Sequence, residues 1–211
     1  MIVYGAGGFA REVAWLLLMI SKDDGSRRPV AFVDDASGRD DRQLNGLPIL
    51  DLDQAVRRFP GAAFVAAIGS PTARRAVTEK AITAGLVPAR CIAPDVLVSD
   101  WVDVGEGVVI CSGSILTTNI RLGTGVQINL DCTVGHDVVM GDYTTLAPGV
   151  HVSGWVHFGA NVYVGTGAVL INGTEDAPLI VGDGAVVGAG ACVTHSVEPS
   201  STVVGVPAKP R

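Results

Sequence analysis

Apolar residues recur at every sixth position through the second half of the chain. From Ile92 to Leu170 no in-phase position is polar, and the phase resumes at Val181 after a short insertion. The in-phase residues are Ile92, Val98, Val104, Ile110, Leu116, Leu122, Ile128, Val134, Met140, Leu146, Val152, Phe158, Val164, Leu170, Val181, Val187 and Val193. A period of six matches neither an amphipathic helix nor a simple alternating strand.

Hexapeptide self-similarity is typical of β-helices. Each hexad would supply one short strand and one corner, and three hexads would close a triangular coil. The in-phase side chains would then stack at roughly 4.8 Å, the ordinary spacing of neighbouring strands. Glycine often follows the in-phase residue, as at Gly105, Gly135 and Gly165, which suits corners where backbones approach closely. We therefore predict a parallel β-helix over residues 89–211.

The first part of the chain alternates short apolar runs with helical patterns. We expect strands at residues 2–4, 29–33, 47–50 and 62–68, and helices at residues 11–20, 51–59 and 72–84. Strands that alternate with helices indicate a parallel sheet. The sequence therefore predicts a small Rossmann-like α/β domain over residues 1–88, followed by the β-helix domain.

Three strand ends of the α/β domain carry residues suited to a nucleotide or sugar. They are Gly7, Gly8 and Phe9 after the first strand, Asp34 and Asp35 after the second, and Gly69 after a later one. A glycine turn that leads into a helix presents backbone N–H groups to phosphate. Carboxyl ends of parallel strands meet at one edge, where ligands bind in open α/β sheets. The domain is about one mononucleotide half, which argues against a full dinucleotide oxidoreductase.

Charge and composition narrow the possible partners. The 211 residues carry a net charge of −6, so no basic footprint indicates nucleic acid or an anionic membrane surface. The longest early apolar run, residues 13–20, is too short to span a bilayer. No signal-peptide pattern precedes it, so we expect a cytoplasmic protein. The four cysteines form no CxxC pair, and their spacing indicates neither a zinc site nor a disulfide framework.

His136 and Asp137 are the candidate catalytic pair. A corner of the coil can let both side chains project outwards. A carboxylate beside an imidazole fixes its tautomer and raises its basicity, as a general base requires. The alternative is that the dipeptide is simply a solvated turn.

Zinc chemistry is a second alternative, because some hexapeptide β-helices resemble carbonic anhydrases with three histidine ligands at a subunit boundary. The candidates here are His136, His151 and His157, of which the last two are expected at exposed corners. They do not reproduce the close histidine pair of that family, which disfavours a zinc enzyme.

These features together resemble the bacterial sialic acid O-acetyltransferase and nucleotide-amino-sugar N-acetyltransferase family. The resemblance rests on the glycine loop at residues 5–8, residues 32–35 and 68–70, the hexads, His136 followed by an acid, and the closing residues 205–209. It implies a left-handed β-helix, acetyl-CoA as co-substrate, a nucleotide-sugar or sialic acid acceptor, and a homotrimer with active sites between neighbouring β-helices.

The resemblance also implies individual roles. His136 would be the general base, Asp137 would raise its basicity, and the backbone N–H of Gly154 would stabilise the oxyanion. The cofactor contacts would be Thr145, Thr166, Ala189 and Lys209, with Lys209 near a CoA phosphate. The nucleotide sugar would lie against Gly7, Gly8 and Phe9, with Asp34 and Asp35 on its polar groups.

Two departures from the family pattern leave alternatives open. Phe9 stands where many members have histidine, and the insertion at residues 172–179 either shapes the pantetheine channel or is a surface loop. Transfer to an amine and transfer to a sialic acid hydroxyl are both compatible with one histidine base. A non-catalytic trimeric nucleotide-sugar binding protein would be indifferent to His136→Ala.

Overall fold

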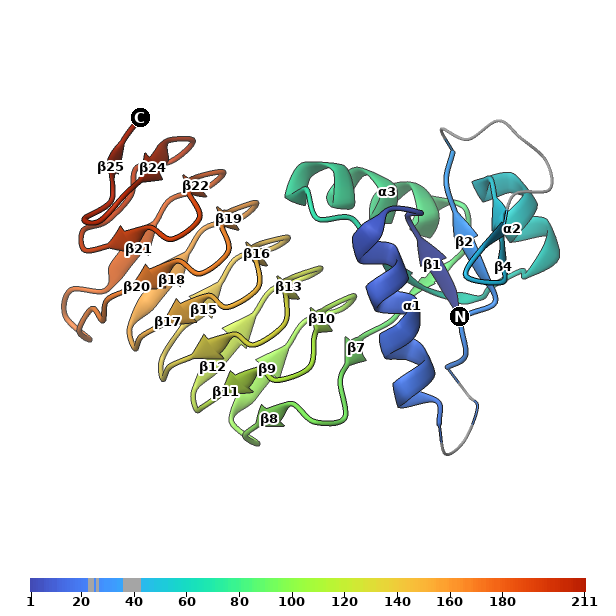
Figure 1. Cartoon of the computed structure of the whole chain (residues 1–211), viewed down its shortest axis with the longest axis horizontal. Helices are drawn as coiled ribbons and strands as arrows, with labels where there is room; N and C mark the ends of the chain where they lie inside the picture. Colours follow the sequence, from blue (N-terminus) through green and yellow to red (C-terminus); the bar gives the residue numbers. More distant parts are fainter. Residues whose placement is uncertain (23–24, 26, 36–42) are drawn as a thin grey trace. The chain divides into compact units, whose positions relative to one another are not determined.

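The computed structural model describes residues 1–22, 25, 27–35 and 43–211. Its contacts divide the chain into two compact units, Met1–Pro94 and Asp95–Arg211 (Figure 1). The boundary therefore lies a few residues later than the predicted position 88. Strand β6 (Val87–Pro88) pairs with β5 (Ala63–Ala66), and β7 (Cys91–Ile92) follows it.

The first unit is built on a sheet with the order β3-β4-β2-β1-β5-β6. Its remaining strands are β1 (Ile2–Tyr4), β2 (Ala31–Val33), β3 (Gln43–Leu44) and β4 (Leu47–Leu50). Only β3 runs antiparallel to its neighbour β4 among the described strands of this sheet. Strands β1 and β2 are buried along their whole length, as continuous apolar runs in a covered parallel sheet should be.

Three helices accompany this sheet in the described part of the unit: α1 (Gly8–Ile20), α2 (Leu52–Arg58) and α3 (Pro71–Thr83). Helix α1 begins at Gly8, three residues before the predicted start, so the glycine loop includes the helix's first turn. Helix α2 opens with a capping box between Asp51 and Gln54, which satisfies two backbone donors at once. None of the helices in the described ranges is long and apolar enough to cross a membrane.

The second unit is a parallel β-helix whose three faces are ladders of very short strands (Figure 1). One face holds β8 (Leu97–Val98), β11 (Ile115–Leu116), β14 (Thr133–Val134), β17 (His151–Val152), β20 (Val169–Leu170) and β23 (Cys192–Val193). The next holds β9 (Val102–Val104), β12 (Ile120–Leu122), β15 (Val139–Met140), β18 (Val156–Phe158) and β21 (Leu179–Val181). The third holds β10 (Val109–Ile110), β13 (Gln127–Ile128), β16 (Thr145–Leu146), β19 (Tyr163–Val164), β22 (Val186–Val187), β24 (Thr202–Val204) and β25 (Lys209–Pro210).

The in-phase residues stack as the sequence predicts. Val134 pairs in register with Leu116 on one side and with Val152 on the other, so one coil takes three hexads. All in-phase residues from Ile110 onwards are buried. Val98 also stacks in register with Leu116, but it is 42% exposed. Within its own unit the first coil has no preceding coil to cover it.

The insertion forms an exposed loop between β20 and β21. Thr174 and Ala177 close it with reciprocal backbone hydrogen bonds of 3.0 and 3.2 Å. At its start, the Gly173 N–H donates to the Gly154 carbonyl at 3.0 Å. The insertion is therefore a surface loop. Its first residues keep the backbone hydrogen bonding of the corner that carries Gly154.

Candidate active site

One corner of the β-helix carries residues in the left-handed backbone region in successive coils. Asn119, Asp137 and Trp155 have φ values of 55°, 57° and 57°. Short polar residues such as asparagine and aspartate reach this region at low cost because their side chains bond locally. A tryptophan there is unusual, which marks the corner as a place where the surrounding structure dictates the conformation.

His136 and Asp137 project outwards from this corner, as expected. The His136 Nδ1 atom lies 2.8 Å from Asp137 Oδ2, and the His136 side chain is 55% exposed. A neutral imidazole bonded to a carboxylate carries its proton on Nδ1. The arrangement therefore leaves Nε2 as the proton acceptor.

Gly154 lies directly against the His136 imidazole. A Cβ atom added to Gly154 would come within 2.5 Å of His136 Nε2, and one added to Gly135 would come within 2.8 Å of the Gly154 nitrogen. Gly154 is buried, and among the described residues no acceptor is bonded to its N–H. The corner therefore presents an unbonded N–H beside a candidate base.

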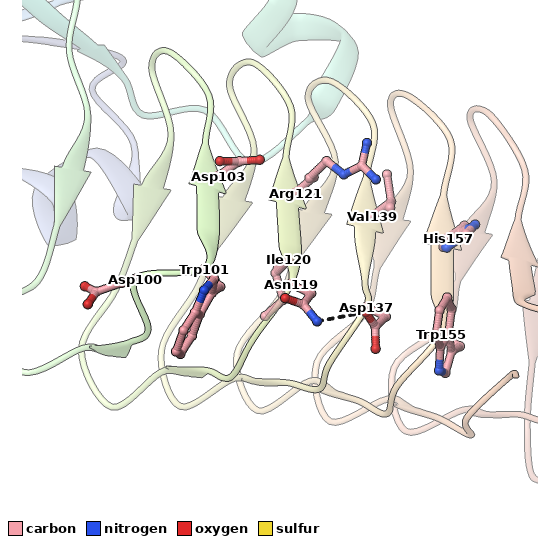
Figure 2. Close-up of a pocket in the computed structure, with 10 residues that line it drawn as sticks. All are labelled: Asp100, Trp101, Asp103, Asn119, Ile120, Arg121, Asp137, Val139, Trp155 and His157. Carbon is pink, nitrogen blue, oxygen red and sulfur yellow. Dashed lines mark hydrogen bonds between the residues drawn. The ribbon is translucent and has the colours of Figure 1, made fainter. Parts of the chain in front are cut away.

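A cavity of about 610 Å³ adjoins the pair. Figure 2 shows Trp101, Asn119, Asp137 and Trp155 in a row along the corner, with Arg121 and other side chains on the strands beside it. The four residues of the row follow one another at 18-residue intervals, so they occupy the same place in consecutive coils. That spacing is present in the sequence, but only His136 and Asp137 carry a recognisable catalytic signal at this corner.

The candidate cofactor residues lie elsewhere on the coil. Thr166 and Ala189 are exposed at the corner between β19 and β20 and at its equivalent one coil later, and the Gly190 N–H donates to the Thr166 carbonyl at 2.8 Å. Lys209 is exposed on β25. Thr145 is only 1% exposed on β16, so its side chain is not available to a cofactor in the single chain. The strands of the β14 face separate this corner from His136.

In the first unit, Gly7, Gly8 and Gly69 are exposed at strand ends and Phe9 is half-buried. Gly7 is the N-cap residue of α1, and no side chain caps the helix there with a hydrogen bond. Helix N-termini without a side-chain cap have free N–H groups that can face an anion. The three glycines thus have the exposure expected of a nucleotide-binding edge.

Asp35 is already engaged by the protein itself. Its Oδ2 accepts hydrogen bonds from the Tyr4 hydroxyl at 2.5 Å and from Lys80 Nζ at 2.6 Å, and its Oδ1 accepts one from the Leu52 N–H at 3.1 Å. Burial acts to raise the pKa of Asp35, but these hydrogen bonds prevail and lower it. Burial and the adjacent Asp35 raise the pKa of Tyr4. Asp34 is half-buried and its N–H donates to the Leu50 carbonyl at 2.9 Å.

Arg74 also belongs to this edge, although no motif in the sequence points to it. It lies on α3 and is only 1% exposed. Its Nη1 donates to the carbonyls of Ile68 and Gly69 at 2.8 and 3.3 Å. A buried guanidinium so placed fixes the loop that carries Gly69.

His151 and His157 do not lie where the sequence predicts them. His151 is in strand β17, with Nδ1 2.9 Å from Thr133 Oγ1, and His157 is in strand β18 on a different face. The prediction that both occupy corners is wrong, because each falls on the residue that forms the ladder of its face. No group of three His, Cys, Asp or Glu residues within the described ranges is placed to hold a metal ion.

Comparisons with known proteins agree with this architecture. Residues 1–81 match the family model described as PglD N-terminal domain. The chain is 34% identical over 209 residues to GDP-perosamine N-acetyltransferase of Escherichia coli O157:H7, covering 98% of this chain and 94% of that protein.

Solved structures agree over the whole chain. WeeI from Acinetobacter baumannii AYE superposes with a TM-score of 0.92 at 38% identity, covering 100% of this chain and 98% of that chain. PerB from Caulobacter crescentus, in complex with CoA and GDP-perosamine, superposes with a TM-score of 0.88 at 28% identity, covering 100% and 96%.

The α/β unit and the hexapeptide coils, together with the similarity to these acetyltransferases, identify an acetyltransferase of the left-handed β-helix class. The predicted fold class is thereby confirmed. Within that class, the chain belongs to the nucleotide-amino-sugar N-acetyltransferase and sialic acid O-acetyltransferase family that the sequence features indicated.

Proposed function

We propose that the protein transfers an acetyl group from acetyl-CoA to the amino group of a nucleotide-linked amino sugar, with a GDP-linked sugar as the first acceptor to test. The observation that carries the proposal is the His136–Asp137 pair packed against the Gly154 N–H. It stands in a chain aligned over 98% of its length with a GDP-perosamine N-acetyltransferase.

His136 acts as the general base in this proposal. Its Nε2 takes a proton from the acceptor amine as the C–N bond forms and the thioester C–S bond breaks. The same proton then passes to the departing CoA sulfur, so the histidine ends the cycle neutral. Asp137 keeps the Nδ1 proton in place and stabilises the imidazolium between these two steps.

Gly154 supplies the electrostatic part of the mechanism. Its N–H stabilises the negative charge that develops on the thioester oxygen, a contribution commonly worth about 3 kcal/mol for one donor. The backbone fixes this donor, so no reorganisation is needed when the charge develops. Acetyl-CoA supplies the acetyl group as a thioester.

The binding roles are part of the same proposal. Gly7, Gly8, Phe9 and Gly69, with Asp34, bind the nucleotide sugar at the exposed edge of the first unit. Asp35 acts there through its backbone and the network that it anchors, because its carboxylate oxygens are engaged. Thr166, Ala189 and Lys209 are exposed and fit a cofactor, whereas Thr145 would contact one only after a local rearrangement.

A homotrimer with active sites between neighbouring β-helices accommodates the separation of these groups. The candidate base and the candidate cofactor residues occupy different corners of one chain, so a second copy can bring one chain's cofactor corner to another's base. The faces of the β-helix also expose apolar side chains, including Ile115 and Val169, each 40% exposed, and Ile180 at 46%. Association can cover such side chains.

The test follows thiol release from acetyl-CoA with GDP-, UDP- and dTDP-amino sugars, CMP-sialic acid and free sialic acid. Wild type, His136→Ala and the exposed-histidine control His195→Ala are measured together. Turnover of an amino sugar that His136→Ala abolishes and His195→Ala preserves supports N-acetylation by His136. Turnover of sialic acid alone would replace the proposal by O-acetylation, and acceptor binding without turnover would favour a binding protein.

A further inference from the structure

Asn119 lies one coil before the catalytic pair and contacts it. Its Nδ2 donates to Asp137 Oδ1 at 3.2 Å, and the other carboxylate oxygen, Oδ2, is the one 2.8 Å from His136 Nδ1 (Figure 2). The three side chains therefore form one hydrogen-bonded series across two coils. Within the described residues no hydrogen bond joins Asn119 to His136, so Asn119 acts on the imidazole only through Asp137.

The orientation of the Asn119 amide follows from its neighbours. An amide oxygen facing the Asp137 carboxylate would place two acceptors together, so the NH₂ group must face it. The Thr118 hydroxyl lies 3.5 Å from Asn119 Oδ1 on the other side of the amide and can donate to it. Thr118 and Asp137 therefore favour the same orientation of the Asn119 amide.

We propose that Asn119 is a positioning residue for the acetyl transfer, which holds the Asp137 carboxylate in the rotation that orients the His136 imidazole. The expected effect on kcat rests on the proposed function, whereas the expected effect on the His136 imidazole does not. Asp137 is half-buried, and among the described residues Asn119 is the one side chain that donates to its Oδ1. With Asn119 present, both oxygens are fixed by protein donors, so rotation of the carboxylate breaks two bonds instead of one.

The backbone at Asn119 decides which substitution is informative. Its φ is 55°, a region that glycine enters freely and alanine does not. Asn119→Gly therefore removes the amide without adding backbone strain. Asn119→Asp keeps the size and the local backbone preference but sets a second carboxylate where the donor stood, which repels Asp137.

Asn161 offers a matched control. It is another asparagine in the left-handed region, with φ 57°, at the corner between β18 and β19 rather than the corner of His136. Asn161→Gly therefore removes a corner amide of the same β-helix without touching the proposed series. Thermal unfolding of all variants would show whether a change is confined to the site.

Kinetics on the acceptor that wild type turns over form the first arm of the test. We expect Asn119→Gly to lower kcat about 10-fold, the lower end of what loss of an outer hydrogen-bond partner of a functional histidine costs in metal sites. Asn119→Asp should lower it further, with both KM values within about twofold of wild type, and Asn161→Gly should keep wild-type kcat. An unchanged kcat in Asn119→Gly, a rise confined to KM, or an equal loss in Asn161→Gly would overturn the proposal.

The second arm needs no acceptor and separates this inference from the proposed function. In ¹⁵N-histidine-labelled protein, the ring nitrogens of His136, assigned by comparison with His136→Ala, report its tautomer. Wild type should show the Nδ1–H form, and Asn119→Asp should show a measurable shift toward mixed tautomers, with Asn161→Gly like wild type. Identical His136 spectra in wild type and both Asn119 variants would refute the positioning role even if no acceptor is ever turned over.

Discussion

Replacing Gly154 with alanine tests whether the contact between Gly154 and His136 matters for the chemistry. The added Cβ would come within 2.5 Å of His136 Nε2, whereas ordinary van der Waals contact begins at 3.4 Å. The imidazole must therefore move by about 0.9 Å, the difference between these distances. Such a movement also disturbs the 2.8 Å bond from His136 Nδ1 to Asp137.

A displacement of about 1 Å at a reacting group can cost a factor of about 100 in rate, which corresponds to about 2.7 kcal/mol of barrier. We expect Gly154→Ala to lower kcat by about that factor in the thiol-release assay. The KM values should change little, because the variant keeps the residues proposed to bind the cofactor and the nucleotide. The Gly154 N–H remains, so the loss would report on the position of His136.

Gly184→Ala is the control for this substitution. Gly184 has a φ of 66°, and the nearest atom to an added Cβ, Ser200 Oγ, is 3.5 Å away. An alanine there strains the backbone by about 1–2 kcal/mol without a clash, so it should lower the melting temperature and leave kcat unchanged. Wild-type kcat in Gly154→Ala, or an equal loss in Gly184→Ala, would refute the reasoning.

Two further predictions concern stability. Because the folded-state pKa of Asp35 is lowered, its ionised form contributes stability above the unfolded value of about 4, and this contribution disappears as the pH falls through the folded value. Wild type should therefore lose its stability advantage over Asp35→Asn on acidification below about pH 4, measured by urea unfolding; a constant difference across that range would contradict the network. Ile128 is fully buried and pairs in register with Ile110 and Leu146, so Ile128→Ala should lower the free energy of unfolding by about 2–5 kcal/mol, and a loss below 1 kcal/mol would mean that the coils collapse around the gap.

Much of the fold could be predicted because the six-residue repeat of the β-helix is visible in the sequence as a recurrence of apolar residues. Each coil repeats the same three inward positions, so the spacing of Leu116, Val134 and Val152 predicts that these side chains stack. The α/β unit was predictable for a different reason, since its strands are continuous apolar runs and Asp51 and Ser70 are ordinary helix caps. The start of α1 was not, because Gly8 and Phe9 carry no helix signal and Gly7 provides no side-chain cap.

The candidate site was predictable in part. His136 and Asp137 are adjacent in sequence, so their contact needed only an outward corner. Asp35 was predicted as a substrate ligand, but its engagement by Tyr4 and Lys80 requires β1, the end of β2 and helix α3 to meet, which no local pattern reveals. The burial of Thr145 depends equally on tertiary packing.

The 18-residue coil relates the predicted residue Asp137 to two neighbours that were not predicted, Asn119 and Trp155. In the coils before the insertion, a residue has its lateral neighbours 18 positions away. The environment of Asp137 is therefore set by Asn119 before it and Trp155 after it. Both neighbours share its left-handed backbone, and all three line the same cavity. The candidate catalytic corner is therefore a column of residues at one-coil intervals. Replacing Asn119 or Trp155 should alter the orientation of the His136 imidazole, although neither residue is next to His136 in the sequence.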